Sequence, residues 1–195
     1  MQSPRVQSDR PPKRHKGLVM IFTGDGKGKT TAAMGLALRA TGNRMRVRII
    51  QFIKGSWKTG ERPAFAQLAD LGWPVELEIA GRGFTIDRLR DPRVSDEEHQ
   101  VAARAGLERA KASLDSGEID LLVLDEIMGS IKAGLVTVDE VLDLIARKRP
   151  ATHLVLTGRN APPPLVEAAD LVTEMTMIKH HYRGQGITAQ RGVEF

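Results

Sequence analysis

Short apolar runs alternate with stretches of helical spacing along most of the chain. Residues 18–22 (LVMIF) and 120–124 (DLLVL) are nearly continuous apolar runs, which is typical of strands buried on both faces. Further strands are predicted at residues 46–53, 75–79, 153–157 and 171–177. Helices are predicted between the strands, at residues 30–42, 63–71, 95–116, 137–149 and 162–170.

Local signals support the helix boundaries. Ser95 with Glu98, and Thr137 with Glu140, have the spacing of capping boxes, and Pro150 ends the second of these helices. Strands that alternate with helices predict an α/β fold, with a mostly parallel central sheet flanked by helices on both faces. Ligands of such sheets bind beyond the carboxyl ends of the strands. We therefore expect a site among the loops after residues 22, 53, 79, 124 and 157.

A glycine-rich motif follows the first predicted strand. Residues 23–31 read TGDGKGKTT and end like the phosphate-loop pattern G-x-x-x-x-G-K-[ST], but Thr23 stands where the first glycine is usual. Backbone amides of such a loop, at the start of a helix, form a cradle for phosphate. Lys29 adds a charge for phosphate oxygens, and Thr30 offers a hydroxyl to Mg²⁺. The predicted ATP-binding residues of this motif are Gly24, Asp25, Gly26, Lys27, Gly28, Lys29, Thr30 and Thr31.

Two further loops carry candidate ligands. Asp125 and Glu126 follow the strand at residues 120–124, where a carboxylate can hold Mg²⁺ together with Thr30. A helix cap or a chance acidic pair is the alternative interpretation. Arg159 and Asn160 follow the strand at residues 153–157 and are predicted to contact ATP phosphates. An ordinary turn with a solvated arginine is equally compatible with that pattern.

Aromatic and histidine residues give weaker signals. Trp57 lies in the irregular stretch 54–62, where it would cover a flat ligand or pack on the surface. His180 and His181 are adjacent, and neighbours on one strand point to opposite faces, which disfavours a shared metal. Only 4% of residues are aromatic, so a nucleic-acid partner is not expected despite the net charge of +5.

Composition defines the remaining expectations. Residues 1–16 contain five Lys or Arg, one Asp and three Pro, and are predicted to be a flexible basic tail before a single domain at residues 17–195. The chain has no cysteine, as in many cytoplasmic proteins, and no apolar run approaches the roughly 20 residues that span a bilayer. We therefore expect a cytoplasmic protein without a membrane segment.

The motifs taken together resemble a known family. FTGDGKGKTTAAMGLALRA, IIQFIKGSWKTGE, GRGFT, LLVLDEI, LVLTGRNAP, ADLVTEM and IKHHYRGQGITAQRGVEF occur in this order. This set resembles the P-loop type of ATP:corrinoid adenosyltransferases in the cobalamin pathway, over roughly residues 17–195. The residues alone leave two alternatives, a P-loop ATPase or kinase that cleaves at the γ-phosphate and a nucleotide-dependent regulatory module without turnover.

The resemblance implies a fold, a reaction and partners. It implies a RecA-like P-loop fold, a homodimer, and an electron donor such as a flavoprotein. The 5′-deoxyadenosyl group of ATP passes to the Co(I) centre of a reduced corrinoid, and triphosphate leaves whole. ATP lies in the loop with its phosphate chain reversed relative to other P-loop enzymes. Lys29 is expected to stabilise the leaving triphosphate.

The resemblance also assigns the corrinoid site. In the family, a G-F-T-W segment places aromatic residues below the ring, where they displace the lower axial ligand of cobalt. Here the segment reads GRGFTID, so that Phe84 matches the first aromatic residue and Ile86 stands where tryptophan is frequent. Trp57, Phe84 and Ile86 are the predicted corrinoid-binding residues, and Phe84 and Ile86 are also expected to assist catalysis. The family's N-terminal lid is helical, unlike the proline-containing tail of this chain.

Overall fold

Six parallel strands form the centre of the molecule. The computed structural model describes residues 16–53, 55, 59–83 and 92–195. The strand order is β3-β2-β4-β5-β1-β6, and every pairing is parallel. The strands are β1 (Val19–Thr23), β2 (Val47–Gln51), β3 (Val75–Ile79), β4 (Leu121–Asp125), β5 (His153–Thr157) and β6 (Leu171–Glu174).

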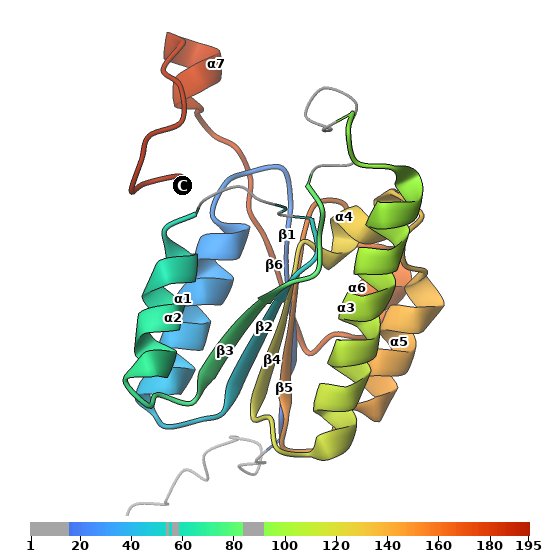
Figure 1. Ribbon diagram of the computed structural model, residues 1–195. Coiled ribbons are helices and arrows are strands. Elements are labelled where there is room, and N and C mark those ends of the chain that lie inside the picture. The colour runs from blue at the N-terminus through green and yellow to red at the C-terminus, as the bar shows by residue number, and fades with distance from the viewer. Residues whose placement is uncertain (1–15, 54, 56–58, 84–91) are drawn as a thin grey trace, which may run out of the picture.

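Helices cover both faces of the sheet (Figure 1). One face carries α1 (Lys29–Gly42) and α2 (Glu61–Asp70), which pack on a core that includes Phe65 and Val123. The other face carries α3 (Asp96–Ser116), α4 (Ile127–Lys132), α5 (Val138–Arg147) and α6 (Pro163–Ala168). The predicted α/β fold class, with a parallel sheet between two helical layers, is confirmed.

Strand register brings the predicted site loops to one edge. Gln51 at the end of β2 is paired with Asp125 at the end of β4. Phe22 of β1 is paired with Thr157 at the end of β5. Because all strands run in the same direction, the loops that follow them share the carboxyl edge of the sheet (Figure 1). This edge contains the candidate site.

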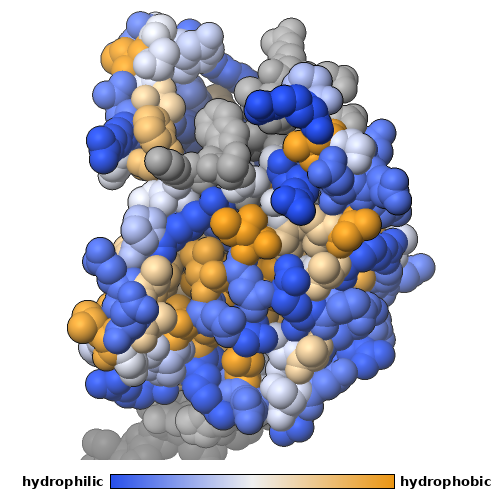
Figure 2. Space-filling model, in the orientation of Figure 1, coloured by the Kyte–Doolittle hydropathy of each residue, from blue (hydrophilic) through white to orange (hydrophobic). Residues whose placement is uncertain are grey.

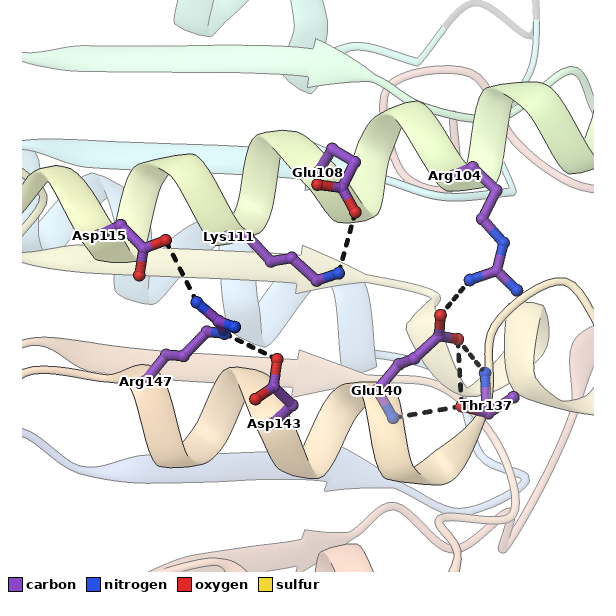
Figure 3. Close-up of polar contacts among 8 residues, drawn as sticks. All are labelled: Arg104, Glu108, Lys111, Asp115, Thr137, Glu140, Asp143 and Arg147. Carbon is purple, nitrogen blue, oxygen red and sulfur yellow. Dashed lines mark hydrogen bonds and ion pairs between the residues drawn. The ribbon is translucent and has the colours of Figure 1, made fainter.

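Both predicted capping boxes are present at the starts of α3 and α5. The Ser95 and Thr137 side chains accept hydrogen bonds from the backbone of the third helical residue, and the glutamates there return the contact. Figure 3 shows how ion pairs between α3 and α5 use the same residues, since Glu140 caps α5 and also pairs with Arg104. Such exposed ion pairs contribute at most about 1 kcal/mol each, so they add little to the stability of the fold.

The C-terminal region differs from the prediction. A strand was expected at residues 171–177, but β6 ends at Glu174 and all four of its residues are exposed at the edge of the sheet. The histidines do not alternate on a strand, because His180 caps α7 (His181–Gln185) and the two rings stack with centroids 4.6 Å apart. The helices α4 and α7 were not predicted, since each is only about one turn long. In the described ranges, no helix is long and apolar enough to cross a membrane.

Candidate functional site

The glycine-rich loop (residues 24–28) connects β1 to α1 and packs against the backbone of Met175. The Gly26 amide donates to the Met175 carbonyl at 2.6 Å. A β-carbon built on Gly24 or Gly26 would lie 2.5 or 2.6 Å from that same oxygen, which no side chain tolerates. Gly28 precedes α1 with φ of 108°, a conformation that favours glycine. The three glycines are therefore required by the close approach of Met175 and by the turn into α1.

Lys29 is held against this loop. Its Nζ donates to the carbonyl oxygens of Gly24 and Gly26 at 2.6 and 2.7 Å, and the residue is 6% exposed. Burial lowers the pKa of Lys29 below its ordinary value, and the nearby positive charge of Arg159 lowers this pKa further. An incoming anion would offset both effects, because it compensates the charge that burial disfavours.

Asp125 is the centre of a buried polar cluster at the ends of β2, β4 and β5. Its Oδ1 accepts hydrogen bonds from the Thr30 and Thr157 hydroxyls at 2.9 and 2.8 Å. Its Oδ2 accepts from Gln51 Nε2 at 3.1 Å, and the residue is fully buried. The structure therefore brings Thr30 and Asp125 together as the sequence predicted. The contributions of Gln51 and Thr157 were not predicted.

Glu126 has a different environment from Asp125. It adopts a left-handed conformation with φ of 60°, which turns the chain from β4 into α4. Its backbone amide donates to the Thr157 hydroxyl at 2.9 Å, and the residue lines the cavity beside the glycine-rich loop. The predicted metal ligands Thr30, Asp125 and Glu126 thus offer hydroxyl and carboxylate oxygens, the donor atoms that Mg²⁺ prefers. This donor set fits the ion.

Arg159 lies beside the same loop. It follows β5 and lines the cavity, with its Nη1 atom 3.8 Å from Asp25 Oδ1. Asn160 is exposed, adopts a left-handed conformation with φ of 54°, and lies outside the cavity wall. The structure thus brings Arg159, but not Asn160, to the loop.

The cavity above the loop has a wall that the sequence did not predict. It measures about 260 Å³. Glu194 lines this cavity and forms an ion pair with Lys27. The other carboxylate oxygen of Glu194, Oε1, lies 2.8 Å from His181 Nε2. The hydrogen bond from Lys27 lowers the pKa of Glu194. The residues that line the cavity are Gly26, Lys27, Gly28, Lys29, Thr30, Thr31, Glu126, Arg159, Val193 and Glu194.

A larger cleft opens between β3 and α3 at the same edge of the sheet. It measures about 900 Å³ and has both apolar and charged walls, with Ile79, Val101 and Arg82 among them. Figure 2 shows hydrophobic side chains gathered on this side of the molecule, between α2 and α3. Arg82 is two residues from Phe84 in the sequence. The predicted corrinoid residues Trp57, Phe84 and Ile86 lie outside the described residues.

Comparison with known proteins identifies the class and then the family. The fold is that of an α/β protein whose parallel sheet carries a glycine-rich loop and a buried carboxylate at its carboxyl edge. Residues 15–195 match the family model described as ATP:corrinoid adenosyltransferase BtuR/CobO/CobP. The chain therefore belongs to this family of ATP:corrinoid adenosyltransferases.

Relatives in three bacteria agree with this assignment. The corrinoid adenosyltransferase of Pseudomonas aeruginosa is 39% identical over 183 residues, which cover 92% of this chain and 84% of the relative. The protein of the same name from Sinorhizobium sp is 40% identical over 184 residues, covering 92% and 81% of the two chains. That of Escherichia coli K12 is 34% identical over 180 residues, covering 92% and 86%.

Proposed function

We propose that this protein transfers the 5′-deoxyadenosyl group of ATP to the Co(I) centre of a reduced corrinoid and releases triphosphate, in the synthesis or salvage of adenosylcobalamin. The match of residues 15–195 to the adenosyltransferase family carries this proposal. The cobalt–carbon bond forms with the electron pair of Co(I). The bond between C5′ and its oxygen breaks, and its electron pair leaves with the triphosphate. No hydroxyl or water has to be deprotonated, so the step needs no general base.

The glycine-rich loop is the proposed binding site for the triphosphate. Negative charge grows on the leaving oxygen as the C5′–O bond breaks, so preorganised cations there favour the reaction. Lys29 would exchange the Gly24 and Gly26 carbonyls for phosphate oxygens, and Arg159 would approach from the opposite loop. Asp25, Lys27, Thr31 and Asn160 stay candidate contacts. In the proposed reversed orientation of ATP, the loop holds the leaving group and C5′ extends toward the corrinoid.

Mg²⁺ is the proposed cofactor. Thr30, Asp125 and Glu126 would hold it, directly or through water, because they place oxygen donors beside the phosphate cavity. The ion would supply additional charge neutralisation on the triphosphate. Hydrogen bonds from Thr157 and Gln51 fix the Asp125 carboxylate, so that one orientation of its oxygens is available before any ligand binds.

The 900 Å³ cleft between β3 and α3 is the proposed corrinoid site. Ligand pockets commonly enclose about 300 to 1,000 Å³, and a corrin ring with its side chains is a large ligand. β3 lies four strand positions from β1, which is about 19 Å at the usual strand spacing. The adenosyl end of ATP would therefore extend along the carboxyl edge toward β3. Trp57, Phe84 and Ile86 would contact the corrinoid from the adjoining loops, and Phe84 and Ile86 would exclude its lower ligand.

The remaining proposals concern the setting of the reaction. We propose a homodimer, a single catalytic domain at residues 17–195 after a flexible tail at 1–16, and a cytoplasmic location. An electron donor such as a flavoprotein would supply Co(I), because the reaction needs a reduced corrinoid. The family resemblance supports the dimer and the donor, and the absence of cysteine from the sequence agrees with the location.

Product analysis tests the proposed reaction. Purified protein with ATP, Mg²⁺ and chemically reduced corrinoid is expected to yield a light-sensitive cobalt–carbon product and one triphosphate for each. An ATPase or kinase would instead give ADP, and a regulatory module would bind ATP without products. Either of these results under reducing conditions would overturn the proposal.

A further inference from the structure

Thr23 makes a contact that a glycine at its position could not make. It is the last residue of β1 and stands where the common phosphate-loop pattern has its first glycine. Its Oγ1 accepts a hydrogen bond from the backbone amide of Ala161 at 3.1 Å. We propose that Thr23 is a positioning residue, whose hydroxyl holds the turn that carries Arg159 against the phosphate cavity. This inference rests on the proposed phosphate contact of Arg159.

The turn after β5 contains two residues with positive φ. Gly158 has φ of 139° and Asn160 has φ of 54°, which is the left-handed region. Glycine and asparagine adopt positive φ more readily than other residues, so the sequence allows this turn, and contacts with β1 hold it in place. The Gly158 amide donates to the Phe22 carbonyl at 3.2 Å, and the Ala161 amide donates to Thr23. Both ends of the turn are therefore attached to the last two residues of β1.

This attachment links the two loops that form the phosphate cavity. β1 leads directly into the glycine-rich loop, and Arg159 is the residue of the turn that lines the cavity with that loop. Arg159 lies near Asp25 and contributes to the lowered pKa of Lys29, so its charge already acts on the loop. Without the Thr23 hydroxyl, the Ala161 end of the turn would lose this restraint. Arg159 would then sample more positions away from the phosphates.

A purely structural role for Thr23 makes a different prediction. Threonine is β-branched and favours the end of a strand whatever its hydroxyl contacts. In that case removal of the hydroxyl changes the stability of the protein, and any effect on phosphate binding is the same with or without the Arg159 side chain. A positioning role instead requires coupling, so the effect of Thr23 on phosphate binding should disappear when the Arg159 side chain is absent.

Binding of inorganic triphosphate with Mg²⁺ to the full-length protein tests the inference. Calorimetry would compare wild type, Thr23→Val, Thr23→Ser and Arg159→Ala, together with the double variant Thr23→Val/Arg159→Ala. Thr23→Val keeps the shape and removes the acceptor, so it should weaken triphosphate binding about 2- to 12-fold, the range of one ordinary hydrogen bond. Thr23→Ser should bind like wild type. In the Arg159→Ala background, Thr23→Val should add less than about a 2-fold loss.

Three results would overturn the inference. If Arg159→Ala binds triphosphate like wild type, both the inference and the proposed role of Arg159 are wrong. If Arg159→Ala is weakened but Thr23→Val is not, only the inference is wrong. Equal losses from Thr23→Val in both backgrounds would show that the hydroxyl acts without Arg159. Should Thr23→Val not fold, Thr23→Ala also removes the hydroxyl and takes its place in the same comparison.

Discussion

Replacement of Asp125 by asparagine tests whether its carboxylate holds the proposed Mg²⁺. Asparagine keeps the shape of the side chain and removes the charge. If its amide oxygen replaces Oδ1, the amide nitrogen faces the Gln51 donor across 3.1 Å. Gln51 cannot simply rotate, because its own oxygen accepts from Arg62 Nε at 3.2 Å. The amide nitrogen should therefore face Thr30 and Thr157, and these hydroxyls would change from donors to acceptors.

The structure allows the cost of this change to be estimated. Thr157 already accepts from the Glu126 amide and has a second lone pair for the new donor. Each side chain of the cluster keeps a partner, but the buried Thr157 hydroxyl hydrogen loses its acceptor, so the loss is about 1 to 3 kcal/mol. For a chain of this size, that lowers the melting temperature by about 2 to 12 °C. Asp125→Asn should therefore fold.

Magnesium dependence is the decisive readout for Asp125→Asn. ATP affinity would be measured by calorimetry over a range of Mg²⁺ concentrations and with a chelator. The variant should lose about 10- to 100-fold of the enhancement by Mg²⁺, the usual cost of disturbing a metal site. Its metal-free ATP affinity should be unchanged or higher, because a negative charge near the phosphates is gone. Asp120→Asn, just before the opposite end of β4, is the matched control. Wild-type magnesium dependence in Asp125→Asn would refute the proposed role.

Three further predictions address the lysines, the corrinoid site and the C-terminus. ATP should raise the lowered pKa of Lys29, so ATP binding should take up a proton and should weaken as pH rises through the pKa of the free protein, which lies below 10.5. Calorimetry in buffers of different ionisation enthalpy measures the proton uptake. Absence of uptake in alkaline buffer would contradict this prediction. Lys29→Ala should abolish both proton uptake and most transfer activity. Phe84→Ala should slow adenosylation from Co(II) corrinoid and leave the rate from Co(I) largely intact; equal losses from both states would exclude a role in ligand displacement. Glu194→Gln should tighten ATP binding several-fold by releasing Lys27 and removing a negative charge from the cavity wall, and weaker binding would show that the carboxylate supports the ligand instead.

Local patterns predicted most of the fold. The apolar run at residues 120–124 and the capping box at Ser95 each depend on neighbours in the sequence, and the structure contains both elements. The same holds for the helix that begins after the glycine-rich loop. The short helices α4 and α7 were missed because one turn of helix has too few residues to show a periodic pattern. β6 was predicted too long, since alternation at residues 171–177 continues past the last paired residue.

The candidate site was predictable where a motif or the sheet topology places the residues, and not where it depends on other distant contacts. Parallel strands bring their carboxyl ends together, so Thr30 and Asp125 could be expected to meet. Thr157 was read as an ordinary strand residue, because nothing nearby shows that its hydroxyl contacts Asp125. Glu194 is 167 residues from Lys27, and no spacing rule connects them. Thr23 and Ala161, which are also in contact, are 138 residues apart.

The central claim is that the bond between C5′ and oxygen breaks and that triphosphate leaves whole. ATP labelled with ¹⁸O at the oxygen that bridges C5′ and the α-phosphate tests it most directly. The protein would be given this ATP, Mg²⁺ and Co(I) corrinoid, and the products would be analysed by mass spectrometry. The account predicts that all the label appears in triphosphate and none in the adenosyl product. Label retained on a nucleoside or nucleotide product, such as ADP, would contradict it.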